Sequence, residues 1–112
     1  MTELAIGFVV IYRWRLHPGK ERQFQQAWER ATPALMRLRG ALGSRLHCAE
    51  DGTWVAYAQW SSRQAWEQSR ALRSVDPYAS RQMLEAEAEA YAPVLLTPVA
   101  DFLTRNAIHR SD

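Results

Sequence analysis

In the segment WVAYAQWSSRQAW, residues 54–66, the pattern of side chains changes from that of a strand to that of a helix. In WVAYAQW (54–60), two tryptophans and two alanines alternate with a second set of side chains, which is typical of a β-strand. Ser61 and Gln64 then have the spacing of a capping box, which predicts a helix that opens at Ser61 and carries Trp66. Because tryptophans occur in both halves, we expect the strand and the helix to share one core.

The N-terminal part of the chain predicts a strand followed by a long helix. Residues 7–16, GFVVIYRWRL, are rich in β-branched and aromatic side chains, which favour a strand. After a Pro-Gly turn, apolar residues recur every three or four positions from residue 20 to 39, the spacing of an amphipathic helix. Pro33 lies inside this helix and predicts a kink near residues 29–33. We expect the buried stripe of the helix to contain Phe24, Trp28, Ala31, Leu35 and Leu38.

The middle of the chain predicts a β-hairpin. LGSRLHCAE (42–50) and TWVAYAQW (53–60) both have strand composition. The dipeptide Asp51-Gly52 between them is a strong signal for a tight turn, because glycine adopts the left-handed conformation that such turns require. We therefore expect these two strands to pair antiparallel.

The C-terminal part completes the architecture. Residues 78–91 predict a helix, and residues 94–103 predict a strand that Pro98 confines to a sheet edge. Asp76-Pro77 separates this helix from the one that opens at Ser61, and we treat the two as one broken helix. The order strand, helix, strand, strand, broken helix, strand is then the β-α-β-β-α-β pattern of ferredoxin-like α+β domains. We expect a four-stranded antiparallel sheet with its helices on one face. Residues 1–104 would form a single domain and residues 105–112 a flexible tail.

The two phases of the strands assign different roles to the two faces of the sheet. The more apolar phase is expected to face the helices, where alanines between tryptophans leave room for a pocket. The alternative is that these tryptophans only fill the core. The side chains expected to line the pocket are Trp14, Trp28, Trp54, Ala56, Ala58, Trp60, Trp66 and Met83.

The opposite phase mixes apolar, cationic and amide side chains. Such a face is too apolar for a solvent surface and too polar for a core, which favours a homodimer in which two sheets face each other. The side chains expected at that dimer interface are Ile11, Arg13, Arg45, Tyr57 and Gln59.

Two residues are candidates for catalysis. Tyr12 lies near the centre of the first strand, and its ordinary pKa near 10 makes it a hydrogen-bond donor rather than a base. His47 would titrate near neutral pH and is the best candidate base by chemistry. Its phase places it with Arg45 on the expected dimer face, where a structural hydrogen bond is the alternative role.

Composition narrows the classes of function. The net charge is +2 and the basic residues are scattered, so we expect no nucleic-acid binding. The single cysteine and three dispersed histidines predict neither a disulfide nor a metal site. No run approaches the roughly 20 apolar residues of a membrane span, and no leader peptide is evident. We expect a cytoplasmic protein.

Three segments in this order, VVIYRWRLHPGKERQFQQAW, ALGSRLH and YAQWSSRQAW, resemble the antibiotic biosynthesis monooxygenase domain superfamily. The resemblance implies a dimeric α+β barrel and a cofactor-independent monooxygenase. It would oxidise a small aromatic or polycyclic compound with molecular oxygen, without metal or flavin. Heme-degrading members place an asparagine where this chain has Tyr12, so heme cleavage is not expected. The alternative is a non-catalytic dimeric module that binds a small ligand or takes part in an assembly.

Overall fold

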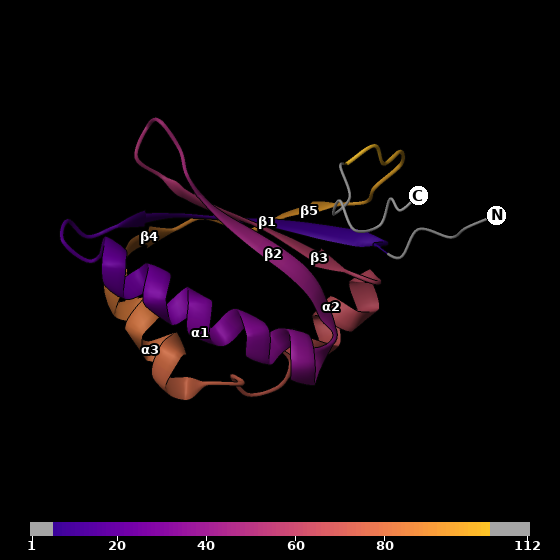
Figure 1. Cartoon of the computed structure of the whole chain (residues 1–112), viewed down its shortest axis with the longest axis horizontal. Coiled ribbons are helices and arrows are strands. Elements are labelled where there is room, and N and C mark those ends of the chain that lie inside the picture. The colour runs from indigo at the N-terminus through magenta and orange to yellow at the C-terminus, as the bar shows by residue number, and fades with distance from the viewer. Residues whose placement is uncertain (1–5, 104–112) are drawn as a thin grey trace, which may run out of the picture.

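The computed structural model of the protein describes residues 6–103, which form one sheet and three helices. Figure 1 shows all three helices on one side of the sheet and the segment after β5 on the other side. The sheet therefore has a helix-covered inner face and an outer face without helices. In chain order the elements are β1 (Phe8–Leu16), α1 (Glu21–Arg39), β2 (Ala41–Cys48), β3 (Trp54–Trp60), α2 (Arg63–Arg70), α3 (Pro77–Ala86), β4 (Glu87–Ala90) and β5 (Val94–Leu96).

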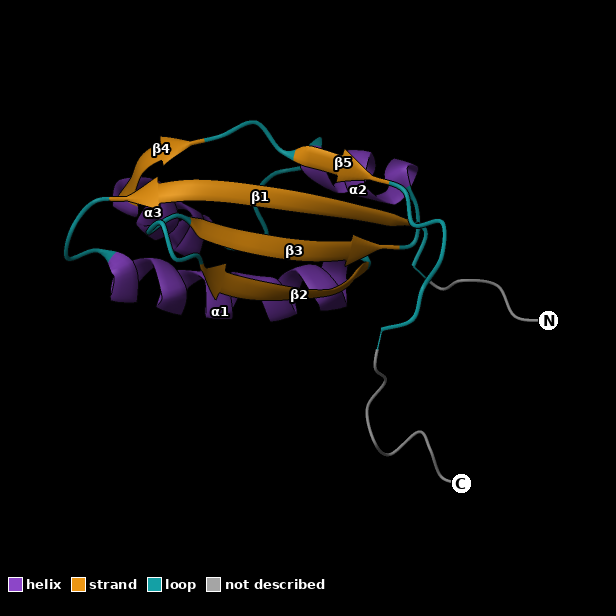
Figure 2. Cartoon of the chain, turned by 90° about the horizontal axis from the view of Figure 1, so that it is seen from above, coloured by secondary structure: helices purple, strands orange, loops and turns teal. Residues whose placement is uncertain are grey.

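The sheet confirms the predicted α+β, ferredoxin-like arrangement. Its strands follow the order β2-β3-β1-β4, with β5 also paired to β1, and every pairing is antiparallel (Figure 2). In the register, Tyr12 of β1 and Leu46 of β2 both lie opposite Ala56 of β3. These side chains therefore share one face, and their immediate neighbours along each strand share the other. The sheet is open rather than closed into a barrel within one chain.

The last strand differs from the prediction, because two short strands take its place. The predicted helix 78–91 ends at Ala86, and Glu87–Ala90 forms β4 against the C-terminal end of β1, where Ala90 lies opposite Trp14 and Glu87 opposite Leu16. Of the predicted strand 94–103, only Val94–Leu96 is paired. The free edge of β1 offers backbone groups that outweigh the helical preference of the sequence EAEA. Pro93 has no N–H to donate to this edge, which fits the interruption between β4 and β5.

The two shorter helices, α2 and α3, each begin at a side chain that caps the helix N-terminus. Ser62, and not Ser61 as predicted, caps α2, because its Oγ accepts a hydrogen bond from the N–H of Ala65 at 3.1 Å. Asp76 caps α3 through the N–H of Ala79, also at 3.1 Å. The carboxylate of Asp76 is paired with Arg30 of α1 as well, and these bonds lower its pKa. The Asp76 side chain therefore fixes the start of α3 against α1.

Helix α1 continues through Pro33 and ends at Gly40, whose φ of 82° is the left-handed conformation of a helix stop. The buried line on this helix runs through Phe24, Ala27 and Ala34. Leu38 lies off this line and is 65% exposed, which contradicts its predicted place in the buried stripe. Among the described helices, none combines the length and the apolar character that crossing a bilayer requires.

The core of the inner face divides into two clusters. Under α2, Phe8, Val10, Trp60 and Trp66 pack together, with Tyr12 against them. Under α1 and α3, the cluster contains Leu16, Phe24 and Ala86, with Trp14, Leu46, Trp54 and Met83 against it. The rings of Tyr12 and Trp14 stack with centroids 5.9 Å apart, and they join the two clusters across the middle of the sheet. The prediction for residues 105–112 lies outside the described residues.

Candidate functional site

The two candidate catalytic residues do not meet. Tyr12 lies on the inner face, whereas His47 belongs to the alternate phase of β2, opposite Val55 of β3. His47 is exposed, and its Nδ1 lies 3.2 Å from the carbonyl oxygen of Val55. The sheet therefore separates the histidine from the tyrosine. An acid-base pair of these two residues within one chain is excluded by the geometry.

Tyr12 is held at the inner face by Trp66 of α2. The indole Nε1 of Trp66 donates a hydrogen bond to the hydroxyl oxygen of Tyr12 at 2.8 Å. Burial raises the pKa of Tyr12, while the hydrogen bond from Trp66 and the charge of Arg70 oppose this effect. The phenol therefore stays protonated at neutral pH. Because its oxygen already accepts from Trp66, its own proton is available to another acceptor.

Trp66 connects this hydrogen bond to a surface groove. Its side chain is 3% exposed and packs against Phe8 with ring centroids 5.5 Å apart. The guanidinium of Arg70, one turn further along α2, lies 4.7 Å from the centre of the indole. A groove of about 460 Å³ opens beside these two residues, and Arg63, Glu67, Ala71, Pro93 and Leu95 line the rest of it. Figure 2 shows α2 lying under β5, the two elements that form its walls.

The other side chains predicted to line a pocket are distributed through the core. Trp14 and Trp54 pack edge-on against Phe24, with ring centroids at 4.8 and 6.2 Å. Ala56 is 2% exposed, and Ala58, Trp28 and Met83 are half-buried. Trp60 is buried, and within the described residues its indole N–H has no hydrogen-bond partner. Of the predicted set, Trp66 lines the groove beside α2, and none lines the hollow on the outer face of the sheet.

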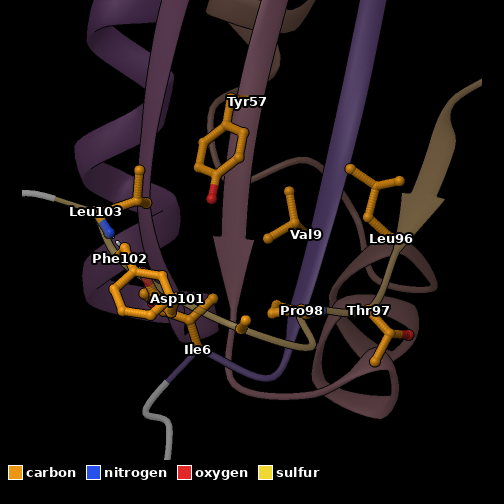
Figure 3. A pocket seen from close by; sticks show the side chains of 10 residues that line it. Ile6, Val9, Tyr57, Leu96, Thr97, Pro98, Asp101, Phe102 and Leu103 are labelled. Atoms are coloured by element: carbon orange, nitrogen blue, oxygen red, sulfur yellow. Dashed lines mark hydrogen bonds between the residues drawn. The ribbon is translucent and has the colours of Figure 1, made fainter.

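A second hollow, of about 550 Å³, lies on the outer face. Figure 3 shows Val9 and Tyr57 projecting from the sheet into it, with the chain from Leu96 to Leu103 along its rim. Its lining is mainly apolar, with Tyr57, Thr97 and Asp101 as polar members. Within it no side chain is positioned as Tyr12 is, with a buried hydroxyl held by an indole. The outer hollow therefore has the character of a packing surface.

The side chains predicted for the dimer interface do share this outer face. The register places Ile11 of β1 and Arg45 of β2 on either side of Tyr57 of β3. Arg13 lies two residues after Ile11 on β1 and therefore points to the same face. Gln59 follows Tyr57 in the same phase of β3, opposite Val9. The guanidinium of Arg13 lies over the ring of Tyr91, 4.6 Å from the centre of that ring. The face is thus continuous across three strands.

Sequence reasoning missed two contributors to these hollows. Arg70 follows Trp66 by one helical turn, and this i, i+4 spacing could have indicated that the two side chains meet. Thr97, Pro98 and residues 100–103 line the outer hollow, although the sequence predicted a strand there. Pro98 was the signal that this segment leaves the sheet. Among residues 6–103, no three His, Cys, Asp or Glu side chains gather as metal ligands would.

Comparison with known proteins gives one family match. The family model for antibiotic biosynthesis monooxygenases matches residues 7–80. These residues run from the start of β1 into α3, so they include Tyr12, Trp66 and Arg70. No protein of curated function matches the sequence.

Solved structures share the fold at low sequence identity. SnoaB, a cofactor-independent oxygenase from Streptomyces nogalater, has a TM-score of 0.71 and 16% identity, over 87% of this chain and 97% of that one. The monooxygenase of the gene ActVA-Orf6 from Streptomyces coelicolor, in complex with nanaomycin D, has a TM-score of 0.67 and 21% identity, over 92% and 96%. Rv0793 from Mycobacterium tuberculosis has a TM-score of 0.68 and 19% identity, over 84% and 96%. These similarities show a common fold.

Proposed function

The chain belongs to the antibiotic biosynthesis monooxygenase family, and from this premise we propose that it is a cofactor-independent monooxygenase of small aromatic or polycyclic compounds. The observation that carries the proposal is the Tyr12 hydroxyl, held by Trp66 with its proton still available. Two structural neighbours support the proposal: SnoaB is a cofactor-independent oxygenase, and the ActVA-Orf6 protein is a monooxygenase whose structure holds the ligand nanaomycin D. The nearby groove of about 460 Å³ falls within the usual size of small-molecule sites, roughly 300–1,000 Å³.

The proposed reaction begins with an aromatic ketone whose carbonyl is conjugated through the rings with an acidic methylene group, as in an anthrone. Transfer of a proton from this methylene to water gives a delocalised anion whose charge rests largely on the ketone oxygen. Tyr12 donates its O–H to this oxygen and so stabilises the anion. Because burial keeps the phenol of Tyr12 protonated, it can serve in this way at neutral pH without acting as a base.

The anion itself then reduces molecular oxygen. It transfers one electron to O₂, and the two radicals combine at the former methylene carbon to give a peroxide anion. This anion takes a proton from water, and the resulting hydroperoxide loses water to give a quinone. One oxygen atom enters the product and the other leaves as water. The substrate supplies all the electrons, so no external reductant is needed.

The first test is oxygen uptake with an anthrone-type phenol. The Tyr12→Phe variant is expected to lower kcat by about tenfold to a hundredfold, because it removes one donor to the developing anion. The matched control is Tyr78→Phe, which changes an exposed tyrosine on α3 and is expected to keep wild-type kcat. If the wild-type protein consumes no oxygen with any phenol of a panel, the enzyme proposal is wrong and the non-catalytic binding module remains.

We also propose that two copies associate through their outer faces. Tyr57 and Ile11 are half-buried in one chain, the outer hollow is mainly apolar, and Val99 and Phe102 after β5 are more than 90% exposed. Apolar side chains so exposed are expected to be covered by a partner. A two-fold axis through this face would bring each hollow opposite its copy.

Light scattering at micromolar concentration tests the association and is expected to give the mass of a dimer. The Tyr57→Arg variant places a cation on each outer face, which is expected to weaken the dimer by about a hundredfold or more through repulsion and desolvation. The control Tyr78→Arg adds the same charge on α3 and is expected to leave the dimer intact. A monomeric wild-type protein would refute the proposed interface.

A further inference from the structure

The charges in the groove between α2 and β5 are not equivalent. Arg63 is paired with Glu67, since its Nε lies 2.9 Å from a carboxylate oxygen of that residue. Arg70 has no carboxylate partner within residues 6–103, and its guanidinium lies over the Trp66 ring instead. As far as residues 6–103 are concerned, the groove therefore contains one neutralised cation and one cation without an acidic partner.

The position of Arg70 relates this free charge to the candidate catalytic tyrosine. Arg70 lies against one side of Trp66, and the Nε1 of the same indole donates to Tyr12. The charge of Arg70 acts on Tyr12, because it lowers the pKa of that phenol against the effect of burial. Trp66 is therefore the side chain through which Arg70 and the Tyr12 hydroxyl are connected.

The remaining walls of the groove suit the body of an aromatic molecule. Its apolar members are Ala71, which follows Arg70 at the end of α2, and Pro93 and Leu95 from the β5 segment. Apolar walls with a few polar groups are the usual composition of small-molecule sites. A guanidinium binds a carboxylate with two parallel N–H bonds, which fixes both its position and its orientation.

We propose that this groove selects aromatic substrates that carry a carboxylate, and that Arg70 binds the carboxylate. The inference rests on the proposed oxygenase function for the fate of the ligand, but not for its binding. Arg70 is a specificity residue in this scheme: it positions the ring through a group remote from the carbon that is oxidised. A neutral aromatic of the same shape would enter the same groove with lower affinity.

Calorimetric titration with anthraquinone-2-carboxylate and with its neutral carboxamide tests the inference. Wild-type protein is expected to bind the acid about tenfold more tightly than the amide, the usual value of a charged hydrogen bond at a partly exposed site. Arg70→Gln is expected to abolish this preference, and Arg70→Glu to reverse it. The matched control is Arg81→Gln, which removes an exposed arginine of α3 outside the groove, and it is expected to keep the preference.

The quinone probes are already oxidised, so their binding is independent of turnover. Equal affinity of the wild-type protein for the acid and the amide would overturn the inference, even if oxygen uptake with neutral phenols succeeded. A preference that survives in Arg70→Gln would also overturn it. Conversely, a preference that depends on Arg70 without any oxygen uptake would support the binding site and refute the oxygenase. Thermal unfolding of each variant verifies that this exposed position leaves the fold intact.

Discussion

Replacing Phe24 with alanine is expected to lower the free energy of unfolding by about 3–5 kcal/mol, the usual cost of deleting a fully buried phenylalanine. Phe24 is 0% exposed on α1 and belongs to the cluster that joins this helix to β1 and α3. Its ring meets both Trp14 and Trp54 edge-on. The truncation would therefore remove apolar burial and two aromatic contacts, and it would leave a cavity beneath the helix.

Urea denaturation followed by circular dichroism measures this loss. The matched control is Met36→Ala, which changes an apolar residue of the same helix that is 45% exposed. That change is expected to stay within about 0.5 kcal/mol of the wild-type stability. Similar losses for the two variants would mean that the Phe24 cluster does not anchor α1 to the sheet.

The sequence predicted the parts of this fold in which one periodicity decides the structure. The alternation in residues 54–60 and the helical spacing in residues 20–39 correspond to β3 and α1. The segment Glu87–Ala90 was misassigned, because its glutamates and alanines favour a helix while the open edge of β1 takes it into the sheet. Such pairing depends on a strand more than seventy residues away, as in the Arg15–Glu89 ion pair, and a local pattern does not contain it.

The candidate site could be predicted in its parts but not in its assembly. Strand phase placed Tyr12 on the inner face and Arg45 on the outer face, as the register has them. The alanines between the tryptophans suggested a hollow, yet Ala56 is covered and the groove lies further along, between α2 and β5. The groove depends on how α2 lies beside Pro93, a tertiary relation that no single segment specifies. Arg70 is a candidate binding residue only because α2 and the segment around Pro93 together form this groove.

Trp66→Ala is expected to lower the free energy of unfolding by about 3–5 kcal/mol, as Phe24→Ala does. Trp66 is the buried residue of α2, and its ring packs against Phe8. Trp66→Phe separates the hydrogen bond from the packing, since phenylalanine keeps a ring but has no N–H. In a double-mutant cycle with Tyr12→Phe, the bond is expected to give a coupling of about 0.5–1.5 kcal/mol. The cycle is measured by urea denaturation.

The comparison variant for this cycle is Trp60→Phe, in the same cluster. Within the described residues, the indole N–H of Trp60 is buried without a partner, so its removal relieves an unsatisfied donor and offsets part of the lost packing. Trp60→Phe is therefore expected to destabilise less than Trp66→Phe and to show no coupling with Tyr12→Phe. Equal coupling for the two tryptophans would mean that the Tyr12 hydroxyl is not held by Trp66, and the proposed orientation of its proton toward a substrate would lose its basis.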